Sequence, residues 1–217
     1  MSWRYNLKHF LKSSYLKDVY QFGVYTGQSM IDIYKVIREN NISINNFFGF
    51  DSFEGMPQET AEPLAQECWK EGEFDARKYF SVNSVEDSLK ATYNILEQNG
   101  LSNPPVKLIP GFYADLKDDI IKEYNMQPAL YIDIDCDIYS SAKTALDFMF
   151  RNKLVREGSI LGFDDWSTPG WEIGQSGESR AFKEILQQYN AEAHLLVQFG
   201  FSHPHIHCVF RIINIKD

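Results

Sequence analysis

Acidic residues stand at the ends of two apolar runs of this chain, and they are the residues best suited to chemistry. They are Asp133, Asp135 and Asp137 after the run that begins at residue 129, and Asp164 and Asp165 after the run 158–163. Residues two apart in an extended strand project on one side of it. Grouped carboxylates need a counter-charge to stay ionised near neutral pH, and their hard oxygens suit Mg²⁺ or a similar ion. If the two runs are neighbouring parallel strands, we expect four or five acids in one crevice. The alternative is that the acids are solvated strand ends or helix caps.

A glycine turn follows the first predicted strand, which spans residues 18–22. The turn runs from Gly23 through Gly27 to Ser29, and apolar residues then recur at helical spacing from Met30 onward. A strand, a glycine turn and a helix in this order aim backbone N–H groups and the positive end of the helix at a ligand. The spacing GxxxG is not the dinucleotide pattern GxGxxG. The turn therefore predicts a ligand site or a tight bend that needs glycine for steric reasons alone.

Asp51 ends the next apolar run, 46–50. An acid at the end of the second strand is well placed to bind the two hydroxyls of a ribose. Alternatively, Asp51 is an N-cap for the turn 52–57.

The alternation of strands and helices predicts an α/β fold with a Rossmann-like, doubly wound, mostly parallel seven-stranded sheet and a C-terminal antiparallel hairpin. After the strands named above, the predicted strands are 105–109, 129–135, 158–163, 193–199 and 208–213. Helices are expected after Ser84, around Leu116 to Ile121, after Ser140 and over 178–189. Ligands of such sheets bind outside the carboxyl ends of the strands, where the glycine turn, Asp51, Gly111 and the acid cluster all fall.

We expect one domain, 18–217, preceded by an N-terminal arm, 1–17. The aperiodic segment at about 58–83 is long for a loop in a compact domain, which favours a lid over the site. Trp166 and Trp171 could clamp a flat ligand or cover the sheet edge. His203, His205 and His207 lie in the predicted final turn and are interpreted as solvated, with metal ligation as the alternative.

The composition excludes several classes of protein. The 217 residues carry a formal charge of −9, which argues against nucleic acid as a partner. The three cysteines form no CxxC pair, so neither a disulfide framework nor a zinc site is indicated. With no signal peptide and no apolar run long enough to cross a membrane, we expect a cytoplasmic protein without membrane contact. The sequence leaves the oligomeric state open, with a homodimer as one option.

Five segments resemble the class I S-adenosylmethionine-dependent methyltransferases, and more narrowly the macrocin O-methyltransferase family, which acts on sugars of antibiotics and related natural products. The resemblance is carried by residues 22–29, 49–57, 134–141, 163–166 and 177–182, and it covers most of the chain from residue 18 onward. The pairing of Asp-Cys-Asp-Ile-Tyr with a downstream Asp-Asp-Trp is its specific part.

The resemblance implies roles for individual residues. Asp135, Asp164 and Asp165 match the divalent-metal triad, and Asp137 matches the residue proposed as general base. The implied S-adenosylmethionine site comprises Gly23, Thr26, Gly27, Ser29, Asp51, Ser52, Gly111, Phe112 and Asp133. Two positions depart from the pattern: Gln21 stands where an acid is usual, and Asp133 is an additional acid that belongs at most to the outer shell of the metal.

The resemblance thus predicts a metal-dependent O-methyltransferase whose acceptor is a hydroxyl of a sugar, a diol or another small natural product. Two alternatives remain open from the residues. An acid pair of this kind also binds a metal in nucleotide-sugar glycosyltransferases and in DxD-type phosphatases. A non-catalytic S-adenosylmethionine-binding module would keep the fold but gain nothing from the buried acids.

Overall fold

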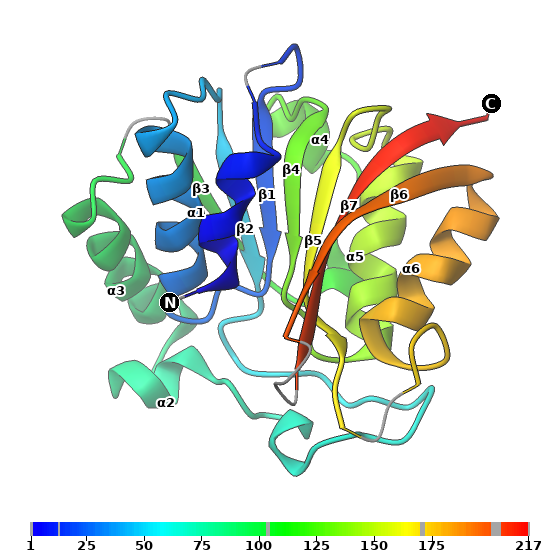
Figure 1. Ribbon diagram of the computed structural model, residues 1–217. Coiled ribbons are helices and arrows are strands. Elements are labelled where there is room, and N and C mark those ends of the chain that lie inside the picture. The colour runs from blue at the N-terminus through cyan, green and yellow to red at the C-terminus, as the bar shows by residue number, and fades with distance from the viewer. Residues whose placement is uncertain (1, 13, 103–104, 170–171, 201–204, 217) are drawn as a thin grey trace.

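The computed structural model describes residues 2–12, 14–102, 105–169, 172–200 and 205–216. A single seven-stranded sheet forms its centre, in the order β3-β2-β1-β4-β5-β7-β6 (Figure 1). The strands are β1 (Asp18–Phe22), β2 (Phe47–Asp51), β3 (Val106–Pro110), β4 (Ala129–Ile134), β5 (Ile160–Ser167), β6 (Ala191–Phe199) and β7 (Ile206–Ile215). Strands β1 to β5 pair in parallel, and β7 pairs antiparallel with both β5 and β6. The predicted fold class is confirmed.

Helices cover both faces of the sheet because successive residues of its buried strands face opposite sides. In β1, Val19 packs into the apolar cluster under η1 (Trp3–His9), α1 (Gln28–Glu39) and α3 (Val85–Gln98). The neighbouring Tyr20 and Phe22 pack into the cluster under α4 (Ile120–Glu123), α5 (Tyr139–Arg151) and α6 (Gly177–Gln188). Of the described helices, none is long and apolar enough to cross a membrane.

Most of the predicted helix boundaries hold to within a few residues. Ser84 caps α3 by accepting a hydrogen bond from the N–H of Asp87, as its sequence pattern predicts. The amphipathic helix expected around Leu116 to Ile121 is shorter than predicted. The chain there forms the 3-10 turn η3 (Tyr113–Asp115) and the single turn α4.

Trp166 is not available to clamp a ligand. It belongs to β5, is buried, and packs against Phe163, Phe182 and Phe210. Trp171, its proposed partner, lies outside the described residues. Trp166 is therefore a core residue of an interior strand, so it neither clamps a ligand nor covers the sheet edge.

The N-terminal arm and the segment 58–83 lie on two sides of the strand ends. Helix η1 lies in front of β1 and beside α1 (Figure 1), and Leu7 within it and Leu11 just beyond it are buried. The segment 58–83 contains η2 (Glu67–Trp69) and α2 (Ala76–Phe80) and passes below the carboxyl ends of the strands in this view. These ends are where the sequence places the functional site.

Candidate active site

A cavity of about 810 Å³ opens at the carboxyl ends of the strands. Its described lining includes seven of the residues expected to bind the cofactor: Gly23, Thr26, Ser29, Asp51, Ser52, Gly111 and Phe112. The four acids expected to hold the metal and accept the proton also line it: Asp135, Asp137, Asp164 and Asp165. Gly27 and Asp133 are not part of the lining. One cavity thus brings together residues from the ends of β1, β2, β3, β4 and β5.

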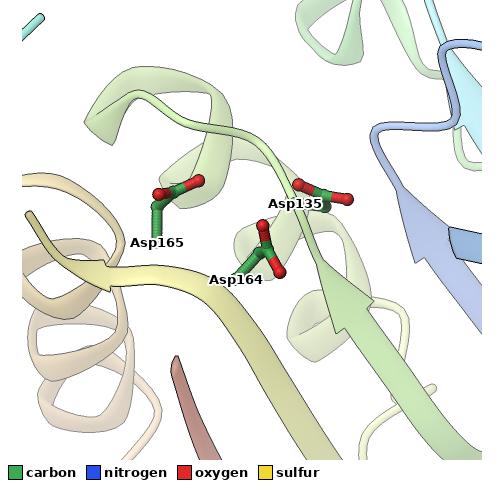
Figure 2. A group of neighbouring side chains, drawn as sticks. All are labelled: Asp135, Asp164 and Asp165. Carbon is green, nitrogen blue, oxygen red and sulfur yellow. The ribbon is translucent and has the colours of Figure 1, made fainter. Parts of the chain in front are cut away.

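The triad predicted for a metal comes together in space (Figure 2). Asp135 follows β4, whereas Asp164 and Asp165 belong to β5, and one oxygen from each of the three carboxylates lies within 4.8 Å of the others. Adjacent residues of a regular strand face opposite sides of the sheet. The β5–β7 register shifts between Phe163 and Ser167, an irregularity of the kind that a β-bulge produces. This local distortion allows both Asp164 and Asp165 to face the cavity.

Arg4 from η1 supplies the counter-charge that the grouped acids require. Its guanidinium bonds Asp133 through Nε (3.0 Å) and Nη2 (2.8 Å), Asp135 through Nη2 (2.9 Å), and Asp164 through Nη1 (3.0 Å). Burial opposes the positive charge of Arg4, but the three carboxylates outweigh burial and hold its pKa well above the ordinary value. The sequence did not indicate this partner, because 129 residues separate Arg4 from Asp133 in the chain.

Arg4 reaches the acids because Gly162 leaves space beside them. Gly162 pairs with Asp133 across β4 and β5, and a Cβ atom at Gly162 would lie 2.1 Å from the Tyr131 hydroxyl and 2.7 Å from the Trp3 ring. Trp3 fills that space and donates its ring N–H to Asp164. Tyr131 donates its hydroxyl to Asp133. The extra acid of β4 therefore has a structural role: it anchors Arg4.

The pKa values of the acids in the cavity are shifted in different directions. Burial acts to raise the pKa of Asp164, but Arg4 and the Trp3 N–H outweigh it and hold that pKa below its ordinary value. Burial and the neighbouring Asp164 raise the pKa of Asp135 well above its ordinary value, and the same two causes raise that of Asp165. Burial and the nearby Asp165 likewise raise the pKa of Asp137. One arginine thus leaves part of the repulsion among the carboxylates uncompensated.

Glu178 holds the two acid-bearing strand ends together, and sequence reasoning assigned it no role. Its carboxylate accepts the N–H of Cys136 and the N–H of Asp165, each at 3.0 Å, and its side chain is fully buried. The resembling segment 177–182 contains this residue, which was the available signal. Glu178 is a positioning residue, because it orients the backbone on which Asp135 and Asp165 stand.

The final turn also contributes to the site. His205 Nδ1 lies 2.7 Å from Asp165 Oδ1, and His207 Nδ1 contacts the carbonyl oxygen of Asp164. Both rings line the cavity, and His207 stacks on Trp3. The interpretation of these two residues as solvated turn histidines was wrong, because pairing of β7 with β5 places them beside the acids. His203 lies outside the described residues.

The glycine turn is held in place by Asp51. Its Oδ2 accepts the N–H groups of Val24 and Tyr25, each at 2.8 Å, and its Oδ1 accepts the N–H of Phe53 at 2.6 Å. The last bond is the turn-capping role considered from the sequence. A carboxylate has about four acceptor positions, so one remains for a ligand. Gly23 has φ +91°, and a Cβ atom there would lie 1.8 Å from the carbonyl oxygen of Asp135, so this position requires glycine on steric grounds.

Gln21 is fully buried at the base of the same turn. Its amide donates to the carbonyl oxygen of Gly23 at 2.7 Å and to the hydroxyl of Ser29. Its Oε1 is buried without a hydrogen-bond partner among the described residues. Gln21 thus links the first strand to Ser29, which lines the cavity.

Comparison with known proteins identifies the family. The family model described as macrocin-O-methyltransferase (TylF) matches residues 7–186. The chain belongs to the macrocin O-methyltransferase family. It is therefore an S-adenosylmethionine-dependent O-methyltransferase. This assignment excludes the glycosyltransferase, the phosphatase and the non-catalytic module that the residues had left open. A search of curated protein sequences found no match.

Solved structures share the fold of this macrocin O-methyltransferase family member. The calicheamicin methyltransferase CalS11 superposes with a TM-score of 0.68 at 19% identity, over 91% of this chain and 72% of that one. The O-methyltransferase NovP superposes with a TM-score of 0.62 at 16% identity, over 97% and 78% of the two chains. A putative rRNA methylase from Clostridium thermocellum follows with a TM-score of 0.55 at 14% identity, over 98% and 94%.

Replacing Arg4 tests its role as the buried counter-charge. Arg4→Met leaves Asp133 buried without its ionic partner, and breaking a buried pair in this way costs about 3–5 kcal/mol. We expect the free energy of unfolding, measured by urea denaturation, to fall by that amount. Lys8→Met in the same short helix is the matched control, because Lys8 is exposed. Equal stability of the two variants would show that Arg4 does not stabilise the fold.

Replacing Glu178 tests its role in joining the strand ends. Glu178→Ala removes the acceptor of two buried N–H groups, each of which costs about 1–3 kcal/mol when left unsatisfied. We expect a loss of about 2–6 kcal/mol in the free energy of unfolding. Glu97→Ala, on the exposed side of α3, serves as the control and should change stability little. Hydrogen exchange of the Cys136 and Asp165 amides should accelerate in Glu178→Ala alone.

Proposed function

We propose that this enzyme requires a divalent metal ion and transfers the methyl group of S-adenosylmethionine to a hydroxyl of a sugar or of another small natural product. The observation that carries the proposal is the grouping of Asp135, Asp164 and Asp165 in the same cavity as the glycine turn. Among the structural neighbours, CalS11 is described as a TDP-rhamnose 3'-O-methyltransferase. This supports a sugar as the acceptor class.

The donor set of the acid cluster fits a hard divalent cation. In the hydrogen bonds and ion pairs described above, Asp135 uses Oδ2, whereas Asp164 and Asp165 use Oδ1. Each of the three carboxylates thereby keeps its second oxygen for an ion, and carboxylate oxygens are the ligands that Mg²⁺ prefers. Arg4, Trp3 and His205 bond the other oxygens and orient the carboxylates. A cation held there would lower the pKa of an acceptor hydroxyl.

The ends of β1, β2 and β3 fit S-adenosylmethionine. Of the residues expected at its methionine part, Gly23 and Ser29 line the cavity and Gly27 does not. The remaining acceptor position of Asp51 would bind a ribose hydroxyl. Ser52, Gly111 and Phe112 continue this side of the cavity. The acidic lining also suits the positive charge of the sulfonium.

Asp137 is the proposed general base. Its backbone has φ +62° just past the end of β4, a conformation that is uncommon for a residue other than glycine and that turns the chain there. From the cavity wall, its carboxylate would accept the hydroxyl proton as the oxygen bonds to the methyl carbon and the carbon–sulfur bond breaks. The products are the methyl ether and S-adenosylhomocysteine.

The segment 58–83 would act as a lid that excludes water. Two of its acids already bond helix N-termini on the far side of the cavity: Glu59 accepts the N–H of Ser140 at 2.8 Å, and Glu62 accepts that of Gly177 at 2.7 Å. Trp69 of the same segment is buried and packs against Met56 and Ile138. These contacts support the proposal that the segment closes over the cavity.

Removing the metal or one of its ligands tests the proposal. EDTA should abolish methyl transfer, and added Mg²⁺ should restore it. Asp164→Asn should weaken Mg²⁺ binding at least tenfold by calorimetry, because the loss of one charged ligand removes a strong oxygen–metal contact, while binding of S-adenosylhomocysteine stays nearly intact. Asp119→Asn, an exposed acid outside the cavity, is the control. Full activity in EDTA would contradict the metal role.

Replacing the proposed base separates proton transfer from binding. Asp137→Asn keeps the size of the side chain but cannot accept the proton, so kcat should fall by about 10²–10⁴-fold. Affinity for S-adenosylhomocysteine and for Mg²⁺ should remain within about threefold of the wild-type values, because Asp137 is in neither proposed ligand set. An unchanged kcat in the folded variant would remove Asp137 from the mechanism.

A further inference from the structure

The two helices that follow the acid-bearing strands are not capped by their own N-cap residues. Helix α5 comes after β4 and begins behind the apolar Ile138, and α6 comes after β5 and begins behind Ser176, whose side chain makes no capping hydrogen bond. In α2 and α3, by contrast, Asp75 and Ser84 each accept an N–H of the first turn. The first N–H groups of a helix have no partner within it, so those of α5 and α6 must find acceptors outside the helix.

The segment 58–83 supplies two of these acceptors. Glu59 accepts the N–H of Ser140 in α5 at 2.8 Å, and Glu62 accepts the N–H of Gly177 in α6 at 2.7 Å. The two bonds join residues that are 81 and 115 positions apart in the chain. A carboxylate at a helix N-terminus is stabilised by the positive end of the helix dipole as well as by the hydrogen bond. One segment thus caps both helices, and it can move away only if it breaks both caps.

Arg180 anchors the second cap to both helices. Its Nη1 bonds Glu62 at 3.2 Å, its Nε bonds Glu184 at 2.9 Å, and its guanidinium carbon lies 4.1 Å from the centre of the Tyr139 ring. Tyr139 is the first residue of α5, whereas Arg180 and Glu184 belong to α6. The side chain of Glu62 is 7% exposed, which limits the screening of its bonds by salt.

The other end of the segment contacts the glycine turn. The rings of Phe74 and Tyr25 lie 5.8 Å apart in an edge-to-face arrangement, and both residues line the cavity. Between this contact and the caps, Gln66 and Trp69 of the segment also line the cavity. In Figure 1 the segment runs below the strand ends from α2 to the region under α6. It therefore bridges the cavity from the cofactor side to the starts of α5 and α6.

The cap of α6 lies next to a residue that positions the acids. Gly177 precedes Glu178, whose carboxylate accepts the N–H groups of Cys136 and Asp165. Loss of the bond from Gly177 to Glu62 would loosen the helical turn from which Glu178 reaches both strand ends. The movement that covers the cavity would therefore also fix the backbone that carries the acids.

We propose, building on the methyl transfer proposed above, that Glu59 and Glu62 form a latch. By capping α5 and α6 they hold the segment 58–83 closed, and the breaking of both caps limits the release of S-adenosylhomocysteine. A helix cap typically changes an equilibrium constant by about fivefold, so two caps that break in one movement multiply to about 25-fold. The latch opens without leaving polar groups unsatisfied, because water can replace each partner once the segment has moved away.

Release of S-adenosylhomocysteine from a double variant tests the latch. From Glu59→Ala/Glu62→Ala, labelled S-adenosylhomocysteine should dissociate about 25-fold faster than from the wild type in a chase with excess unlabelled ligand. Glu71→Ala removes the same charge from an exposed position of the same segment and should keep the rate within about twofold. Equal dissociation rates in the two variants overturn the inference. The measurement needs neither metal nor acceptor, so its outcome is independent of the metal-dependent transfer proposed above.

Hydrogen exchange in the wild-type enzyme gives a second measurement, which does not depend on the folding of a variant. A ligand beneath the segment shifts it toward the closed position, so saturating S-adenosylhomocysteine should slow exchange of the Ser140 and Gly177 amides by the same factor, about tenfold. The Asp87 amide, which Ser84 caps within α3, is the control and should keep its exchange rate. If the Ser140 and Gly177 amides respond differently from each other, or no more than the Asp87 amide, the caps do not open with the segment and the inference is wrong.

Discussion

Carboxylates crowded at the tips of two neighbouring parallel strands are the constraint on which this structure depends. Asp133 belongs to β4 and Asp135 follows it, whereas Asp164 and Asp165 belong to β5. Burial and mutual repulsion raise the pKa values of Asp135 and Asp165. Arg4 compensates part of this charge from the side facing the core. Asp135, Asp164 and Asp165 also line the cavity, so the acids that are costly to bury are the ones that we propose as ligands of a divalent cation.

Much of the surrounding structure follows from holding these acids in place. Gly162 leaves the space into which Trp3 and Tyr131 fit, and η1 docks there with Arg4. Glu178 joins the backbone after β4 to that of β5. Helix η1, Gly162 of β5 and Glu178 of α6 thus all help to hold the same group of acids in place. The N-terminal arm is consequently part of the site rather than an appendage of the domain.

The order of the strands divides the cavity into a donor side and an acceptor side. Strands β3, β2 and β1 lie on one side of the acid cluster, and β5 and β7 lie on the other, with the order of connection reversing between β1 and β4. Ligands of doubly wound sheets bind at such a reversal. The cofactor residues expected from the sequence fall on the first side, whereas His205 and His207 border the second. The acids lie between these two sides of the cavity, which is where the proposed proton and methyl transfers would take place.

The sequence by itself determined the alternation of strands and helices and the boundaries of β1 to β4 to within a residue, because burial periodicity and turn residues act locally along the chain. It placed the end of β5 four residues too early, since that strand continues through Asp164, Asp165 and Trp166 to Ser167. It also indicated that Asp135 and the pair Asp164 and Asp165 would meet, because parallel strands share an edge. Only the tertiary structure decided that Arg4 is the counter-charge, that the irregularity in β5 turns two adjacent acids the same way, and that His205 and His207 lie beside them. Those contacts join residues far apart in the chain, and no local pattern specifies which distant side chain will fill the space left by Gly162.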